Sequence, residues 1–175
     1  MEKLLVEQHA SATPEPCFDS SDSLTVEVRP KAVREAISIL RNRQETITHA
    51  WTLAHRLDGL EEIAEEEAPD QTPIDIDSLL GFLLFLEETA KRHLNCPEIV
   101  LTPTGQIRAE WGDVSSRFFA VRFIGLEDAQ FVLIAPDPAN PRKTVRASTS
   151  CALESVMRLA EPYRVNEWIQ DPDGR

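Results

Sequence analysis

The sequence of 175 residues is poor in the residue types from which catalytic and metal-binding motifs are built. Its three cysteines, Cys17, Cys96 and Cys151, lie far apart, so neither a disulfide framework nor a cysteine-rich zinc site is predicted. None of the six glycines belongs to a G-x-G sequence, and neither a phosphate-binding Walker loop nor a dinucleotide-binding fingerprint is present. His49 and His55 lie six residues apart, which does not place two ligands on one helical face. We therefore expect no metal and no cofactor.

Long apolar runs are also missing. The longest apolar stretch, residues 74–86, contains Asp75 and Asp77 and is shorter than a membrane-spanning helix. The first twelve residues are too short and too charged for a signal peptide. These features predict a soluble, cytoplasmic protein that has no membrane partner.

Candidate nucleophiles occur, but none lies in a sequence motif that is known to activate a nucleophile. Cys96, Cys151 and the serines of residues 148–150 are available, yet none lies in a G-x-S-x-G turn. Serines at this place are typical of helix caps. We expect a protein that is not an enzyme and assign no catalytic residue, with an enzyme that lacks a linear motif as the third alternative.

Acidic residues, by contrast, are abundant. Thirty acidic side chains against eighteen basic ones give a net charge of −12. This charge opposes non-specific binding to phosphates or anionic membranes and is compatible with a basic protein partner, or with solubility alone. Nine acids and no lysine or arginine occur between Asp58 and Asp77. The candidate partner-binding acids in this stretch are Glu61, Glu62, Glu65, Glu66 and Glu67, and the alternative is a solvated linker.

The first half of the chain has a helical pattern. We predict a flexible tail over residues 1–23 and a short strand over 24–28, where apolar and polar residues alternate. Pro30 then suits the first turn of an amphipathic helix. Apolar residues recur at spacings near three, four and seven, which predicts a helix broken near Asn42 and closed by residues 58–59.

A second helix follows the acidic stretch. Residues 58–77 are predicted to be a linker within the mainly helical segment 24–95. Asp77 or Ser78 can cap the next helix, which runs to about His93. Its centre is apolar on nearly every side, which is typical of a helix covered on more than one face.

From residue 96 the apolar period changes to two, which predicts an antiparallel sheet over 96–147. Short connections favour a meander. The predicted strands cover 98–101, 107–111, 118–123, 131–134 (ended by Pro136) and, as an optional fifth, 144–147. Ser148 or Ser150 can cap a C-terminal helix within 148–170. We therefore predict one α+β domain over 24–175, in which N-terminal helices pack on a three-to-five-stranded antiparallel meander with a C-terminal helix.

The two faces of this sheet differ in character. Ile107, Ala109 and Trp111 alternate with polar residues and are predicted to lie beneath the apolar helix. The opposite face offers Arg108, Glu110, Phe118 and Arg122. An aromatic side chain among charges can anchor a protein interface, and the alternative is a second layer in which the N-terminal helices cover this face.

A basic segment opens a nucleic-acid alternative. Residues 29–56 hold six lysines or arginines and two acids. A strand over 24–29 followed by two helices would resemble a ribbon-helix-helix DNA reader, with Arg34, Arg41 and Arg43 as candidate DNA-binding residues. An amphipathic core helix with a basic outer face, attracted to the acidic stretch, explains the same pattern.

Two sequence patterns resemble a group of uncharacterised small bacterial proteins. The first is L-D-G at 57–59, and the second is C-P-E-I-V-L-T-P-T-G-Q-I-R-A-E-W at 96–111. The group shows W-D-G before a helix and P-x-P-D-G-G-I-x-L-E-W after it. The likeness covers 57–123, and this chain has Leu57, Thr104 and Gln106 where the group has tryptophan, aspartate and glycine. The resemblance implies an accessory, antitoxin-like or immunity-like protein and supplies no activity that can be carried over.

These observations together predict a non-catalytic protein-binding module, antitoxin-like or an inhibitory partner of a basic protein. A DNA-binding transcriptional regulator that uses the basic 29–56 segment is the alternative. A homodimer is left open.

Overall fold

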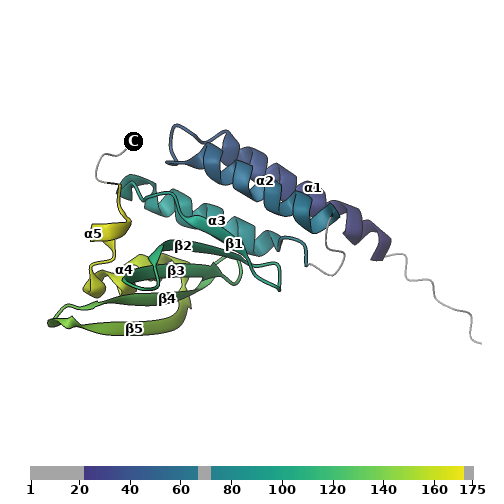
Figure 1. Cartoon of the computed structure of the whole chain (residues 1–175). Helices are drawn as coiled ribbons and strands as arrows, with labels where there is room; N and C mark the ends of the chain where they lie inside the picture. The colour runs from purple at the N-terminus through teal and green to yellow at the C-terminus, as the bar shows by residue number, and fades with distance from the viewer. Residues whose placement is uncertain (1–21, 67–71, 172–175) are drawn as a thin grey trace, which may run out of the picture.

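The computed structural model describes residues 22–66 and 72–171 (Figure 1). Helices come first, strands follow, and short helices end the described chain, so the predicted α+β class is confirmed. The helices are α1 (Asp22–Arg41), α2 (Ala50–Glu66), α3 (Ile76–Thr89), α4 (Val156–Ala160) and α5 (Asn166–Ile169). The strands are β1 (Glu98–Leu101), β2 (Ile107–Asp113), β3 (Arg117–Phe123), β4 (Asp128–Asp137) and β5 (Asn140–Ala152). Short 3-10 turns occupy Ala90–Arg92, Leu153–Ser155 and Glu161–Tyr163.

The five strands form the predicted antiparallel meander, in the order β1-β2-β3-β4-β5. Figure 1 shows β1 nearest to the long helices and β5 farthest from them. A turn from Thr102 to Gly105 joins β1 to β2, closed by a hydrogen bond from the Gly105 N–H to the Thr102 carbonyl (2.9 Å). Gly105 has a φ of 78°, a conformation in which glycine is favoured.

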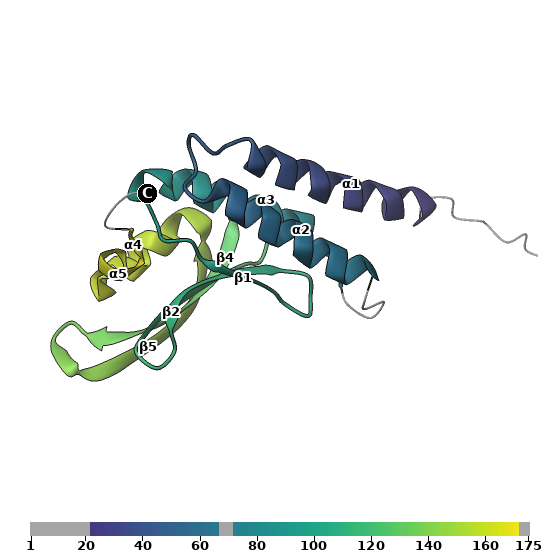
Figure 2. The same ribbon diagram turned by 45° about the horizontal axis from the view of Figure 1, so that its top comes forward.

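One face of the sheet carries the core. The inward side chains of β2, Ile107, Ala109 and Trp111, are all buried, which confirms the predicted alternation. Helix α3 lies against β2 and β3, and its Phe85 ring lies 6.2 Å from the ring of Trp111, so this tryptophan does lie beneath the apolar helix. Helix α4 contacts β4, and α5 contacts β2. Figures 1 and 2 show α1 and α2 side by side as a further helical layer.

A buried serine fixes α3 to the sheet. The Asp75 carboxylate caps α3 by accepting from the Ser78 N–H (2.8 Å). The predicted cap, Asp77 or Ser78, is therefore wrong. Ser78 instead lies fully inside the protein. Its hydroxyl donates to the Phe123 carbonyl (2.7 Å) and accepts from the Ile107 N–H (2.8 Å). This helix side chain therefore satisfies backbone groups of two strands.

The prediction of a strand over residues 24–28 is wrong, because these residues belong to α1. Pro30 lies inside this helix and not in its first turn. A lone five-residue strand would leave its backbone groups unpaired, whereas a helix pairs them within the segment. Of the predicted tail over 1–23, residues 1–21 lie outside the described residues.

The break near Asn42 is confirmed, since α1 ends at Arg41 and α2 begins at Ala50. The predicted end at residues 58–59 is wrong, because α2 continues to Glu66. Leu60 packs against the core and favours this continuation beyond Gly59. Residues 58–66 of the predicted linker are therefore helical, and 67–71 lie outside the described residues.

The C-terminal strands are longer than predicted. Strand β4 continues through Pro136, where the register shifts against β5, a place at which a sheet tolerates proline. Strand β5 extends to Ala152, so Ser148 and Ser150 are strand residues and not helix caps. They lie opposite Val132 and Gln130 of β4, and this pairing replaces the start of the predicted 148–170 helix. Within 22–66 and 72–171, no helix combines the length and apolarity needed to cross a membrane.

Two helix glycines give a matched test of how closely α3 approaches the sheet. A Cβ at Gly81 would lie 2.3 Å from the Gly125 carbonyl oxygen, whereas a Cβ at Gly59 would meet nothing within 4 Å. We expect Gly59→Ala to stabilise the protein by up to about 1 kcal/mol. Gly81→Ala should destabilise it by about 1–3 kcal/mol, because backbone must move. Urea unfolding measures both changes, and equal effects would contradict this packing.

Candidate functional site

The face of the sheet opposite to the core carries no helix over β2, β3 and β4 in the described part of the chain (Figures 1 and 2). Successive strand residues point to opposite faces of the sheet, and residues paired across strands share a face. The register therefore shows which residues lie on this outer face. Its central residues are Glu98, Val100, Arg108, Glu110, Phe118, Ala120, Arg122, Gln130, Val132 and Ile134.

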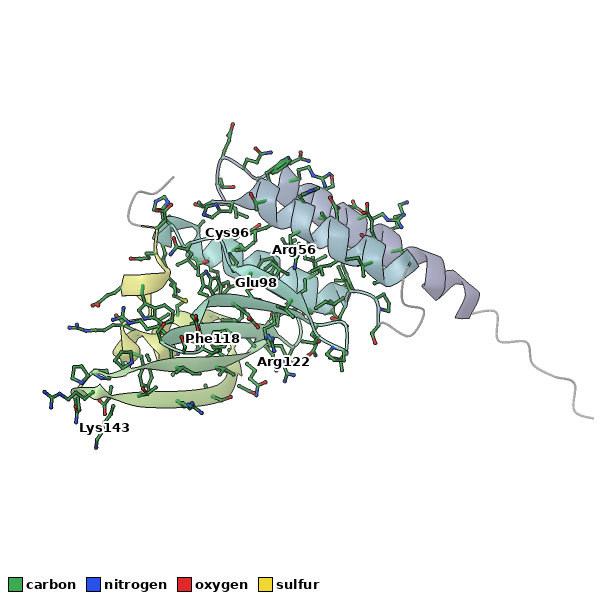
Figure 3. The ribbon with its side chains drawn as sticks, in the orientation of Figure 1. Arg56, Cys96, Glu98, Phe118, Arg122 and Lys143 are labelled. Carbon is green, nitrogen blue, oxygen red and sulfur yellow. The ribbon has the colours of Figure 1, made fainter. Side chains whose placement is uncertain are left out.

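An apolar block lies in the middle of the outer face. Ala120 lies opposite Val132, and Phe118 lies opposite Ile134, so the four side chains are neighbours on two strands. Val132 is 39% exposed, Phe118 and Ile134 are half-buried, and Ala120 is buried beneath larger neighbours. Figure 3 shows Phe118 on the strands, with Arg122 farther along the same sheet. The sheet thus presents an apolar surface that the described helices leave uncovered.

Charged side chains border this block. Arg108 lies directly opposite Arg122, an arrangement of like charges that costs stability unless acceptors are near. Arg108 Nε lies 2.5 Å from Glu110 Oε1 in an ion pair, and the Arg122 guanidinium donates to Gln130 Oε1 (2.6 Å). Arg122 Nε is buried and has no hydrogen-bond partner among the described residues. Three predicted site residues, Arg108, Glu110 and Arg122, therefore come together beside the fourth, Phe118.

The predicted acidic surface is only partly brought together. Glu61 is buried, and its carboxylate lies 3.4 Å from Arg34 Nε. Glu62 is exposed on α2. Glu65 and Glu66 continue α2, but their side chains lie outside the described residues, as does the whole of Glu67.

The three candidate DNA-binding arginines all form ion pairs within the chain. Arg34 pairs with Glu61, Arg41 with Asp58, and Arg43 with Glu87 of α3. The first two pairs join α1 to α2, which confirms the expected attraction between the basic face and the acidic stretch. The strand that a DNA-reading ribbon requires is part of α1. The structure therefore uses these charges to hold helices together.

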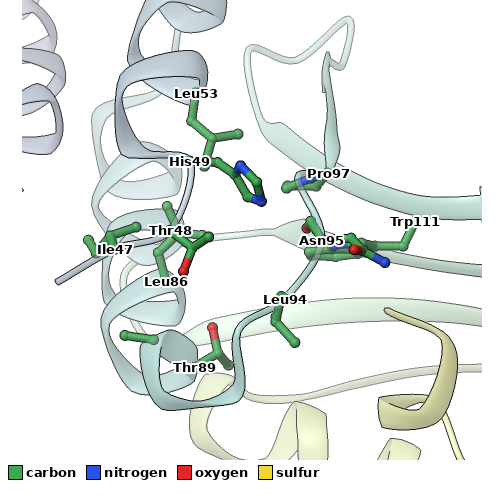
Figure 4. A pocket seen from close by; sticks show the side chains of 11 residues that line it. Ile47, Thr48, His49, Leu53, Leu86, Thr89, Leu94, Asn95, Pro97 and Trp111 are labelled. Carbon is green, nitrogen blue, oxygen red and sulfur yellow. The ribbon is translucent and has the colours of Figure 1, made fainter. Parts of the chain in front are cut away.

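A small pocket lies where the turn before α2 meets the end of α3 (Figure 4). Its walls include His49, whose φ is 64°, and Trp111, whose indole N–H donates to the Asn95 carbonyl (2.8 Å). The volume of about 20 Å³ suits a water molecule and not an organic substrate. Among the residues that the structure describes, no three His, Cys, Asp or Glu side chains gather to hold a metal ion.

The two described cysteines have thiols that are less acidic than usual. Protein atoms partly desolvate the Cys96 thiol, exposed though this residue is, and raise its pKa. Partial burial, and to a smaller extent the Asp128 carboxylate, raise the pKa of Cys151 on β5. Because the thiolate is the nucleophile, both shifts lower reactivity at neutral pH.

No protein-family model, no curated protein and no solved structure matches this chain. The resemblance to the uncharacterised bacterial proteins over residues 57–123 therefore stays a prediction.

The raised pKa values predict a distinct pH dependence of alkylation. In a Cys17→Ser background, iodoacetamide should modify Cys96 and Cys151 more slowly at pH 7 than it modifies an unstructured cysteine peptide, because less thiolate is present. The rates should still rise at a pH where the peptide rate has levelled off. Cys96→Ser and Cys151→Ser assign each rate by mass spectrometry. A thiol that reacts faster than the peptide at pH 7 would refute this description.

Proposed function

We propose that the chain is a non-catalytic protein-binding module that binds its partner through the outer face of the sheet. The observation that carries this proposal is the apolar block of Phe118, Ala120, Val132 and Ile134, which no described helix covers. Protein interfaces typically place apolar and aromatic side chains at their centre and polar ones at the rim. Truncation of a few central residues then removes most of the affinity.

The charged border supports the same proposal. The terminal guanidinium N–H groups of Arg122, one of which donates to Gln130, would also donate to a carbonyl or carboxylate of a bound partner beside the apolar block. The ion pair between Arg108 and Glu110, whose two joined atoms are buried, would then lie at the rim and orient the partner.

The partner we propose is a basic protein, and the role is antitoxin-like or inhibitory. The support is the net charge of −12, which accelerates encounter with a positively charged surface. Glu62 is one exposed carboxylate in the acidic stretch. Because such steering acts over long distances, salt should slow association more than it changes dissociation.

Substitutions in the apolar block test this function. The immobilised full chain is used to capture partners from host lysate, and the captured protein is then purified and measured by surface plasmon resonance. Phe118→Asp and Val132→Asp should weaken binding by about 30-fold or more, as hot-spot losses do. Val132→Thr, which keeps the β-branched shape, should cost less. The matched control is Leu159→Asp, an equally exposed apolar position on α4.

Thermal unfolding confirms that each variant is folded. Raising the salt concentration from 50 to 300 mM should lower the association rate of the unmodified chain. Equal losses in the Val132 and Leu159 variants, or association that is insensitive to salt, would contradict the proposal.

A further inference from the structure

The two edges of the sheet are treated differently by the rest of the fold. The edge strand β1 contacts α2, whereas β5 pairs with β4 and with no other strand of the described residues. Strand β5 is also the longest, with 13 residues, and most of them are exposed. An unpaired edge presents a row of backbone N–H and C=O groups that another strand can use.

This open edge is basic in an acidic protein. Arg142, Lys143 and Arg146 are the charged residues of β5, and the strand has no acid, while the whole chain has a net charge of −12. Arg146 lies opposite Ile134 and therefore on the outer-face side, whereas Arg142 and Lys143 lie in the irregular segment between the Pro136–Thr144 and Asp137–Asn140 pairs. Figure 3 shows Lys143 at the end of the β4–β5 hairpin that lies far from α1 and α2. Three cations therefore lie along the open edge between Arg142 and Arg146.

The positive charges of β5 determine which kind of strand can pair with its open edge. A second copy of β5 would bring cations against cations, which is unfavourable in an antiparallel pair. A segment with carboxylates at alternate positions would instead place them against Arg142 and Arg146. Nucleic acid is a weaker candidate, because the net charge of the protein opposes phosphate binding.

We propose that the open edge of β5 binds an extended acidic peptide segment by β-strand addition. Main-chain hydrogen bonds would supply affinity, and cross-strand pairs of carboxylates with Arg142 and Arg146 would supply specificity. This edge lies beside the apolar block, with Arg146 opposite Ile134, but it would bind through its main chain and its cations, so the inference does not depend on the proposed function.

The probe is a fluorescently labelled, end-blocked peptide of ten residues in which glutamate alternates with valine, measured by anisotropy with the full chain. The peptide should bind, and binding should weaken with salt. Arg142→Glu together with Arg146→Glu should weaken it by about tenfold or more. Arg142→Gln with Arg146→Gln gives a milder loss if the charge reversal disturbs folding. The matched control is Lys91→Glu with Arg92→Glu, two exposed cations after α3.

Further arms separate strand addition from charge attraction alone. A peptide with lysine for glutamate should bind the charge-reversed variant and not the unmodified chain. N-methylation of alternate peptide amides should abolish binding, and β5 amides should exchange more slowly in the complex. Phe118→Asp, on β3 and two strands away from β5, should retain binding, which separates this site from the outer face.

Several results would overturn the inference. One is that the glutamate peptide does not bind at 1 mM. Two others are an equal loss of affinity in the Lys91→Glu, Arg92→Glu control, and binding that persists when alternate peptide amides are N-methylated. Tighter binding of a DNA duplex, or a dimer joined through β5 in solution, would also overturn it.

Discussion

The Ser78 hydroxyl takes the place of one backbone hydrogen bond between β2 and β3 by bridging the two strands. Arg108 pairs with Arg122, so the next pair along the ladder would be Ile107 and Phe123. Ser78 accepts from the first of these and donates to the second, inside the protein where no water competes. Each buried backbone group left without a partner would cost free energy, so Ser78 couples the stability of the sheet to the packing of α3. Gly81 then allows α3 to approach the following β3–β4 turn closely.

This attachment decides where the exposed surfaces of the molecule lie. With α3 fixed on one face, and with α4 and α5 beside it, the apolar side chains of that face are buried in one core. The opposite face of the sheet and the edge at β5 are not covered by the described helices. An antiparallel sheet commonly has one covered and one uncovered face, and here the uncovered one has an apolar block at its centre. The proposed binding surfaces are therefore consequences of how the helices attach.

The sequence predicted those features that local periodicity encodes. The period of two through Ile107, Ala109 and Trp111 placed the core face correctly, and the apolar segment of α3 identified the central helix. The sequence missed interactions between distant residues. Ser78 resembled a helix cap because a serine near a helix start usually is one. The acidic stretch predicts Glu61 as part of a partner-binding surface, but Glu61 pairs with Arg34 on the preceding helix.

The central claim is that Ser78 joins α3 to the sheet, and the most direct test is equilibrium urea unfolding of Ser78→Ala. The change removes the hydroxyl and leaves two buried backbone groups unpaired, which should cost about 2–4 kcal/mol of unfolding free energy. Ser38→Ala, at an exposed position of α1, is the control and should change stability by less than about 0.5 kcal/mol. If the two variants lose the same small amount, Ser78 does not hold α3 on the sheet and the account is wrong.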